Sequence, residues 1–207
     1  MALFPIHLEL AGRLCVIVGG GSVAERRAEA LLECGARVLL IAPDATEGIG
    51  IRAASGDLVW LRTAYQSQHL EDCTLAIAAT DDVAVNAQIA EECRKRRILV
   101  SRADSAAQGD FIVPAQVRRG ALLIDVSTAG ASPTLTSVVR ERIAEQYGPG
   151  WEPLVALFGC IRDRLRALPT EELRQRATRT ILEDEIVKNA LSQGDTQRAE
   201  ARALECL

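Results

Sequence analysis

The amino-acid sequence has few aromatic residues, no excess of positive charge and no long apolar run. Aromatic side chains make up 3% of its 207 residues, which argues against a platform that stacks single-stranded nucleic acid. The formal net charge of −4 argues against a surface dedicated to nucleic acid. The longest apolar runs fall far short of a membrane span, and the first residues lack a basic-then-apolar secretion signal. We therefore expect a cytoplasmic protein that binds neither nucleic acid nor membrane.

Metal-binding patterns are also missing. The two histidines, His7 and His69, stand in unrelated surroundings, and the six cysteines are scattered without a C-x-x-C pair. Cysteines spaced in this way are usually small buried hydrophobes, and metal binding or redox chemistry is the less common alternative. We expect no metal held by the protein.

Strand-like and helix-like segments alternate through the first hundred residues. Strands are expected at 13–18, 37–42, 58–61, 75–79 and 98–101, and helices at 23–34 and 83–96. Alternation of this kind implies right-handed crossovers. We therefore expect an α/β fold with a Rossmann-like, doubly wound parallel sheet.

The pattern changes in the second half of the chain. Asp110–Pro114 and Ala121–Ser127 are expected to be strands that form a hairpin across Arg118-Arg119-Gly120. Ser132 is then the expected N-cap of a helix with Pro133 at its first position.

Further helices are expected toward the end of the chain. Apolar residues recur from Leu154 to Leu168 at steps of four and three, which predicts one amphipathic helix. Thr170 is the expected cap of the next helix, which would run to about Leu191. The polar, alanine-rich tail from Ser192 is expected to fray.

These elements predict three parts: a dinucleotide-binding domain at 1–113, a strand-and-helix element at 114–147, and a helical C-terminal domain at 148–207. Two hairpin strands beside one helix bury little core of their own. A second copy of the chain would stabilise such a unit, so we interpret it as a dimerisation element and infer a homodimer.

A glycine-rich turn is the most informative motif. The strand that ends at Val18 leads into Gly19, Gly20 and Gly21, and a helix pattern follows at once. Read as G-x-G-x-x-A, the segment matches the dinucleotide fingerprint, with Gly19 for the tight turn and Gly21 for close backbone approach. Exposed N–H groups and the positive helix terminus then favour a phosphate.

Polar residues at the ends of two other strands extend this predicted site. Asp44, after Pro43, stands where an acidic residue would accept hydrogen bonds from the adenine ribose, which favours NAD over NADP. The alternative is plain turn chemistry at Pro43-Asp44. Thr80 and Asp81 follow the fourth strand, where open α/β sheets place ligands. Asp81 or Asp82 could equally cap the next helix, which would not exclude contact with the cofactor.

Two further groups could carry chemistry. Asp104 follows the last predicted strand of the sheet, where a carboxylate could act as a general base or simply form a turn. Ser127, Thr128, Gly130 and Ser132 cluster in a loop before a helix, which could bind an anion or serve only as a capping turn.

Several segments of this chain occur together in one known family. They are Leu3–Ile6, Val18–Arg27, Ala76–Asp82, Asp104 with Phe111–Ala115, and Val126–Pro133. In this order and spacing they resemble the siroheme synthase N-terminal family, which comprises precorrin-2 dehydrogenases and sirohydrochlorin ferrochelatases. The match extends from the N-terminus to at least Tyr147, so it is far more specific than the glycine fingerprint alone.

The resemblance implies NAD-dependent oxidation of precorrin-2 to sirohydrochlorin, and in many members insertion of ferrous iron in the same cleft. It implies NAD contacts at Ser22-Val23 and Pro43-Asp44. Asp104 matches the family's essential aspartate, which implies a base that removes a proton while NAD takes a hydride. The tetrapyrrole carries many carboxylates, and the loop at 127–132 with nearby arginines is the candidate to bind them.

Two positions depart from the family pattern. Ser101 stands where many relatives have asparagine, with Arg102 after it, and the family's glycine pair is Ala129-Gly130 here. Neither change removes the redox machinery, but both bear on iron insertion. The alternative function is an NAD-sensing regulatory module, which would use the glycines and Asp44 but not Asp104.

Overall fold

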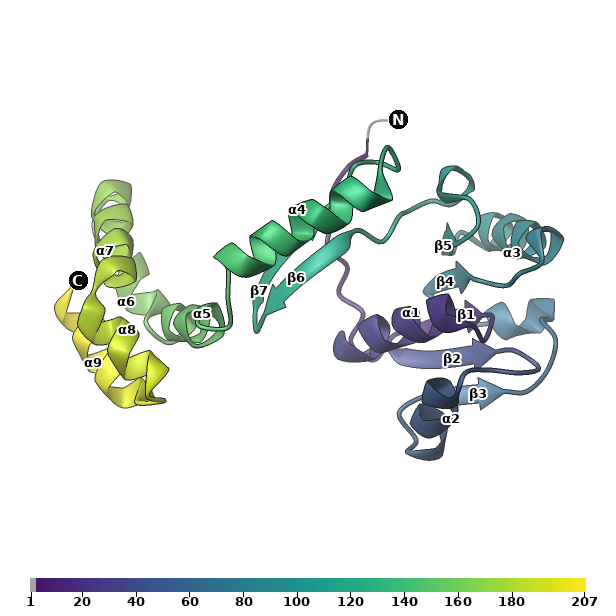
Figure 1. Cartoon of the computed structure of the whole chain (residues 1–207), viewed down its shortest axis with the longest axis horizontal. Helices are drawn as coiled ribbons and strands as arrows, with labels where there is room; N and C mark the ends of the chain where they lie inside the picture. Colours follow the sequence, from purple (N-terminus) through teal and green to yellow (C-terminus); the bar gives the residue numbers. More distant parts are fainter. Residues whose placement is uncertain (1–2) are drawn as a thin grey trace. The chain divides into compact units, whose positions relative to one another are not determined.

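The computed structural model describes residues 3–207, and the chain divides after Val113 into two compact units (Figure 1). The first unit contains a five-stranded sheet, and the second a two-stranded sheet followed by helices. Each unit has a core of its own and is described by itself. Across the described residues, no helix combines the length and the apolar character needed to cross a lipid bilayer.

The sheet of the first unit is parallel, with the strand order β3-β2-β1-β4-β5. Its strands are β1 (Leu14–Val18), β2 (Arg37–Ile41), β3 (Val59–Leu61), β4 (Leu75–Ala78) and β5 (Leu99–Arg102). The connecting helices are α1 (Ser22–Glu33), α2 (Glu47–Ala54), η1 (Ser67–Leu70) and α3 (Val83–Arg96), with η2 (Ala106–Gln108) after β5. This strand order is that of a Rossmann-like sheet, so the predicted α/β fold is confirmed.

Helices cover both faces of this sheet, and β1 lies at its centre. Cys15 and Ile17 pack in one core with α1 and α2, whereas Val16 and Val18 pack in the other with α3. Successive side chains of a strand point to opposite faces, so a strand covered on both sides must be apolar throughout. These four residues are at most 2% exposed, which explains the unbroken apolar run in the sequence.

Helix α2 is an element that the sequence pattern did not predict. It carries Gly48 and Gly50, which lower helix propensity, and Ile49 is its buried residue. Gly48 lies against the Glu25 carboxylate of α1, where a Cβ atom would clash. The helix therefore forms through packing, not through its own propensity.

The second unit begins with a hairpin of β6 (Ala115–Arg119) and β7 (Leu122–Val126), which pair antiparallel. Helix α4 (Pro133–Gln146) packs against both strands and is capped by Ser132, whose Oγ accepts from the Leu135 N–H at 3.2 Å. The hairpin was predicted, but its first strand was wrongly placed at Asp110–Pro114.

The reason for that error is that Asp110 hydrogen-bonds back to β5. Its N–H donates to the Val100 carbonyl at 2.7 Å, and its carboxylate accepts from the Val100 N–H at 3.0 Å. Arg118 and Arg119, expected in the turn, are the last residues of β6, and Gly120 makes the turn with φ +57°.

The chain ends in short helices around a third core. They are α5 (Trp151–Cys160), α6 (Arg162–Arg166), α7 (Glu171–Glu183), α8 (Glu185–Ser192) and α9 (Thr196–Glu205). The cap at Thr170 is confirmed, since its Oγ1 accepts from the Leu173 N–H at 3.2 Å.

Three expectations for these helices were wrong. The helix expected from Leu154 to Leu168 is divided at Ile161 into α5 and α6. The next one is divided at Asp184, whose carboxylate caps α8. The tail expected to fray forms α9, because Ala199 and Ala203 are fully buried in the third core.

The six cysteines are free thiols in varied surroundings. Cys15 and Cys93 are buried, as expected, whereas Cys160 is exposed. Burial raises the pKa of Cys15 to about 11 and that of Cys93 to about 12, so both remain protonated thiols at neutral pH.

Candidate functional site

The glycine turn between β1 and α1 excludes side chains by contact with the neighbouring strand ends. A Cβ atom at Gly19 would lie 2.2 Å from the Ala79 carbonyl oxygen, and one at Gly20 would lie 2.0 Å from the Asp44 carbonyl oxygen. Gly19 also has φ +127°, a conformation that side chains disfavour. The sequence therefore needs glycine at both positions for the three strand ends to meet.

Gly21 is glycine for a different reason. A Cβ atom there would meet nothing within 4 Å and would project into open space at the start of α1. Gly21 is the N-cap residue of α1 and has no side chain to accept from the first N–H groups of the helix. An open cradle at a helix N-terminus fits the diphosphate of a dinucleotide.

This cradle opens into a cleft of about 410 Å³ at the carboxyl ends of the strands. The cleft gathers most of the predicted cofactor-binding residues, which come from the ends of β1, β2 and β4: Gly19, Gly20, Gly21, Pro43, Asp44, Thr80 and Asp81. Ser22 and Val23 do not line it, and lie in the first turn of α1. Asp44 and Asp81 are exposed, so both carboxylates are accessible to a ligand.

Tyr65 is a cleft residue that sequence reasoning missed. It follows β3 and lines the cleft with Thr63, Ala64 and Val85. Its hydroxyl donates to Glu92 Oε2 of α3 at 2.5 Å, which fixes the ring beside the cleft. Burial and this hydrogen bond raise the pKa of Tyr65. The irregular segment after β3 carries no motif that would have marked it.

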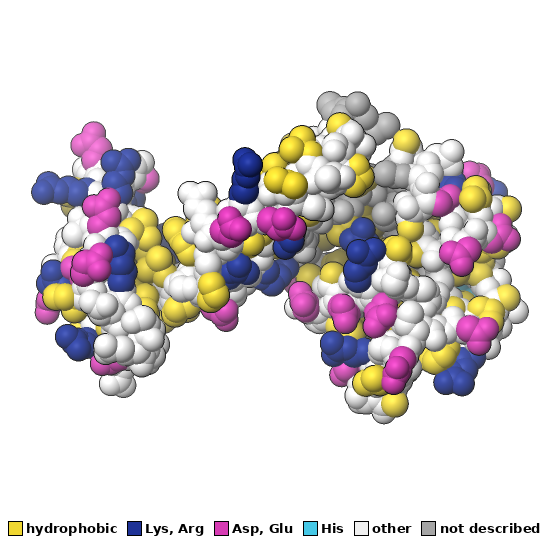
Figure 2. Space-filling model, viewed as in Figure 1, with side chains coloured by type: hydrophobic (Ala, Val, Ile, Leu, Met, Phe, Trp, Pro, Cys, Tyr) yellow, Lys and Arg dark blue, Asp and Glu magenta, His cyan; other side chains and the backbone are white. Residues whose placement is uncertain are grey.

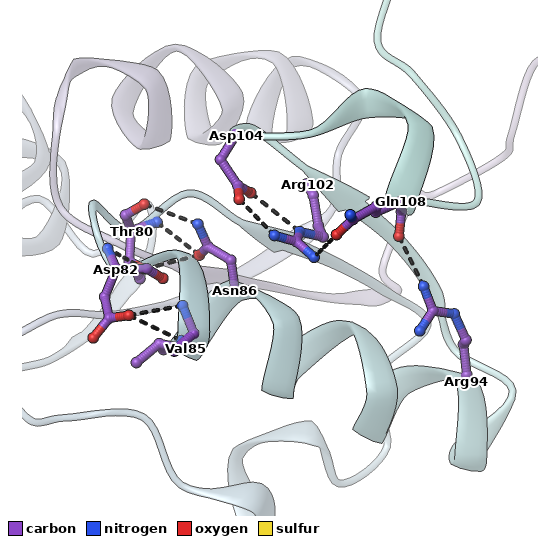
Figure 3. Close-up of polar contacts among 9 residues, drawn as sticks. Thr80, Asp82, Val85, Asn86, Arg94, Arg102, Asp104 and Gln108 are labelled. Carbon is purple, nitrogen blue, oxygen red and sulfur yellow. Dashed lines mark hydrogen bonds and ion pairs between the residues drawn. The ribbon is translucent and has the colours of Figure 1, made fainter.

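Asn86 is a second missed residue, and it holds Thr80 in place (Figure 3). This fully buried amide accepts from the Thr80 hydroxyl at 2.8 Å and donates to the Thr80 carbonyl at 2.9 Å. The helix cap at this point is Asp82, whose carboxylate accepts from the N–H groups of Ala84 and Val85. Asp81 therefore has no capping role and remains a candidate for ligand contact.

Asp104 lies beyond β5, at the same edge of the sheet, and its partner is Arg102 (Figure 3). Arg102 Nε donates to Oδ1 at 3.1 Å and Nη2 donates to Oδ2 at 2.5 Å. The Arg102 side chain is 4% exposed and that of Asp104 is 21% exposed. The hydrogen bonds from Arg102 hold the pKa of Asp104 below its usual range, so the carboxylate is ionised at neutral pH.

Arg102 was named in the sequence only as a departure from a family pattern. Its position two residues before Asp104, at the end of a strand, is a signal that could have identified the pair. Two side chains of opposite charge that are two residues apart along the chain can reach one another, as this pair does.

The loop at 127–132 belongs to the second unit, and its hydroxyls hold its own backbone. Thr128 Oγ1 accepts from the Ser132 N–H at 3.2 Å and shares a hydrogen bond with Thr136 at 2.9 Å. Ser127 Oγ accepts from the Ala129 N–H at 3.1 Å. Ala129 and Gly130 have φ values of +51° and +86°. The loop is thus an ordered capping turn, and anion binding by it stays a prediction.

The first unit matches a known protein family. Residues 6–115 match the family described as "Putative NAD(P)-binding". The chain belongs to this NAD(P)-binding family. Its cofactor is NAD, and the glycine cradle and the cleft described above lie within the matched residues.

The chain is also similar to part of several longer proteins, which are siroheme synthases. The chain is 39% identical over 207 residues to that of Methylococcus capsulatus, 38% over 170 residues to that of Nitrosospira multiformis, and 35% over 202 residues to that of Chromobacterium violaceum. These matches cover 99%, 80% and 97% of this chain, but 43%, 36% and 43% of the relatives. The chain thus spans about two fifths of their length.

The chain is also similar to a solved structure over nearly its whole length. That structure is SirC, a precorrin-2 dehydrogenase, with a TM-score of 0.74 and 27% sequence identity. The match covers 98% of this chain and 100% of SirC, so it includes the C-terminal helices as well as the NAD-binding unit.

Proposed function

We propose that the protein oxidises precorrin-2 to sirohydrochlorin with NAD as the hydride acceptor. The observation that supports this most strongly is Asp104, an ionised carboxylate at the same sheet edge as the glycine cradle. The similarity to SirC along the whole chain supports the same reaction. An NAD sensor, the alternative function, would have no use for this carboxylate.

The residues of the cleft would bind NAD and orient its reactive ring. The N–H groups at Gly20, Gly21, Ser22 and Val23 would hold the diphosphate at the start of α1. Asp44, beside Pro43, would accept hydrogen bonds from the adenine ribose and repel a 2′-phosphate. Thr80 and Asp81 would line the path toward Asp104. Bound NAD supplies the electrophile that accepts a hydride.

Asp104 would act as the base of the reaction. Oxidation removes a hydride and a proton from the tetrapyrrole, and the proton needs an acceptor. A carboxylate has about four acceptor positions on its two oxygens, and Arg102 occupies two of them. Asp104 can therefore take a proton while its pair with Arg102 persists.

The second unit would recognise the carboxylates of the substrate. Ser127, Thr128, Gly130 and Ser132 present a turn at the N-terminus of α4, where N–H groups and the helix dipole favour anions. This role carries over from the family resemblance.

Insertion of ferrous iron into sirohydrochlorin is a second proposed activity, because the relatives are named siroheme synthases. Among the described residues, no group of three or more His, Cys, Asp or Glu side chains could hold a metal ion. In this activity ferrous iron would be a substrate that is inserted into the tetrapyrrole. Asp104 would assist by accepting a proton that the tetrapyrrole loses.

The assembly proposed for this enzyme is a cytoplasmic homodimer. Helix α4 has no fully buried residue, and Leu135 and Val138 on it are 53% and 40% exposed. Hydrophobic side chains gather on the visible face of this helix (Figure 2). A second copy of the chain would cover this apolar face.

The experiment that tests the reaction is an anaerobic assay with NAD and precorrin-2. We expect NADH and sirohydrochlorin to appear together by absorbance, and Asp104→Asn to lose at least about a hundredfold in turnover while NAD binding stays within twofold. Asparagine keeps an oxygen that can accept from Arg102, so the fold is retained. NAD binding without turnover by the unmodified chain would leave the sensor as the function.

Supplying sirohydrochlorin and ferrous iron without NAD tests the second activity. Siroheme formed by the unmodified chain, and lost in Asp104→Asn, is the expected result. Its absence would restrict the protein to oxidation.

A further inference from the structure

We propose that Arg102 is a positioning residue, which holds the Asp104 carboxylate in one orientation and in the ionised form that removes a proton. This inference rests on the function proposed for Asp104. Arg102 is not part of any motif that suggested the function.

The geometry of the pair is that of a two-point fork. The Nε and Nη2 atoms of one planar guanidinium each donate to a different oxygen of Asp104, at 3.1 and 2.5 Å. A fork fixes the plane of the carboxylate as well as its distance, which a single hydrogen bond does not do. Asp104 therefore has a defined direction in which its remaining lone pairs point.

The guanidinium itself is held from the opposite side. Arg102 Nη1 donates to the side-chain oxygen of Gln108, and the backbone carbonyl of Gln108 accepts from Arg94 Nη2 at 2.9 Å (Figure 3). Arg102 is one of the few polar residues that the described structure buries, with 5% of its surface exposed. It cannot turn away from Asp104 without leaving a buried charge unpaired.

The segment that carries Asp104 is tied to the sheet at both ends. The Ala103 N–H donates to the Ala78 carbonyl of β4 at 2.9 Å. At the other end, Asp110 exchanges two hydrogen bonds with Val100 of β5. The fork thus joins two points of a fixed backbone, so its geometry is set before any substrate binds.

Arg102 lowers the pKa of Asp104. Partial burial alone would raise the pKa of the carboxyl group, but the hydrogen bonds and charge of Arg102 lower it, and the buried amide of Asn86 on α3 adds to this. A base must be deprotonated to work, so the rate falls as pH drops through its pKa. Arg102 therefore moves this acid limb to lower pH.

The test measures the pH dependence of kcat/KM in variants of Arg102. Arg102→Met keeps the length of the side chain but removes its charge and fork. We expect its acid limb to move up by at least about one pH unit, which is a loss of about fivefold or more in kcat/KM at the pH of the original midpoint. Arg102→Lys restores the charge without the fork, so a smaller shift is expected.

A matched control is Lys95→Met, which removes a cation of α3 that is 70% exposed and pairs with Glu91. Its acid limb should coincide with that of the unmodified protein. NAD affinity, measured separately by fluorescence titration, should stay within twofold in all three variants. A merely structural role of Arg102 would change stability or amplitude but not the position of the limb.

The outcomes separate this inference from the function on which it rests. If Asp104→Asn is inactive but the acid limb of Arg102→Met coincides with that of the unmodified protein, the positioning role is wrong and the function stands. If Asp104→Asn turns over normally, the function itself fails. Should Arg102→Met not fold, the limb of Arg102→Lys decides, and an unchanged limb there overturns the proposal.

Discussion

The Asp104 carboxylate differs from an ordinary surface carboxylate because its partner is a buried guanidinium. An exposed ion pair contributes little, since water screens it and both side chains lose freedom. Here the guanidinium is buried, so removal of the whole Asp104 side chain would leave it without either of these acceptor oxygens, whereas asparagine keeps one of them. This is why asparagine, and not alanine, is the informative replacement.

The site residues at the strand ends could be predicted from the sequence, but the neighbouring residues Asn86 and Tyr65 could not. Parallel strands end at one edge of a sheet, so the glycines, Asp44 and Thr80 had to meet once the strands were recognised. Asn86 and Tyr65 depend on which way single side chains turn from α3 and from the segment after β3. No periodicity in the sequence records that direction.

The three glycines that mattered most in the sequence now separate into two kinds. In Gly20→Ala the new Cβ meets the Asp44 carbonyl, so we expect a loss of about 1–3 kcal/mol in the free energy of unfolding. In Gly21→Ala the Cβ enters only the open cradle, so stability should stay unchanged while NAD affinity falls about tenfold or more. Denaturant unfolding and NAD titration measure the two effects.

Gly50→Ala in α2 is the matched control, because its Cβ also meets nothing within 4 Å but lies outside the cleft. It should stabilise the helix by about 0.5–1 kcal/mol and leave NAD affinity unchanged. If Gly21→Ala bound NAD as well as Gly50→Ala does, the diphosphate would not occupy the cradle.

At the scale of elements, the sequence located helices better than their ends. Asp184 divides a stretch with helical periodicity because its carboxylate accepts from the N–H groups of Ile186 and Val187. Arg202 of α9 donates to the same carboxylate at 2.8 Å and holds the pKa of Asp184 below its usual range. The break thus depends on a residue 18 positions further along, which local reasoning could not include.

The loop before α4 contains a strained backbone conformation at Ala129, which a substitution can relieve. Ala129 adopts φ +51°, which costs a residue with a Cβ about 1–2 kcal/mol. Glycine avoids this cost but loses more backbone entropy on folding, so we expect Ala129→Gly to raise the free energy of unfolding by about 0.5–1 kcal/mol. Thermal denaturation measures the change.

The neighbouring substitution Ala131→Gly provides the contrast. Ala131 has no positive φ, so glycine there only adds unfolded-state entropy and should destabilise by about 0.5–1 kcal/mol. Equal effects of the two substitutions would show that the left-handed backbone at Ala129 carries no strain.

At the scale of the whole molecule, the two units differ in how completely they bury their apolar side chains. The sheet unit has cores on both faces, whereas α4 leaves apolar residues exposed. The parallel, doubly wound character of the sheet followed from the alternating sequence pattern. The homodimer stays a prediction, which was inferred from how little core a hairpin and one helix can bury.

We expect sedimentation to give twice the 22.3 kDa mass of one chain. Leu135→Asp on α4 should shift the protein to the mass of a single chain, because a charge cannot be buried in an apolar interface. Ile51→Asp is the control, since Ile51 is 62% exposed but lies on α2 of the other unit. A dimer that survives Leu135→Asp would move the interface away from this end of α4.

The hydrogen bonds between Asp110 and Val100 also affect how readily the protein can aggregate. An open sheet offers an unpaired backbone along its outermost strands, and this is a template for sticking to other chains. At one edge of the parallel sheet, Asp110 forms hydrogen bonds with both the N–H and the carbonyl group of Val100 in β5. Gly109 lies so close to this strand that a Cβ atom on it would be 2.9 Å from the Val100 carbonyl oxygen. On the other side, β3 is only three residues long. The segment that carries the proposed base therefore also protects the sheet against edge-to-edge association.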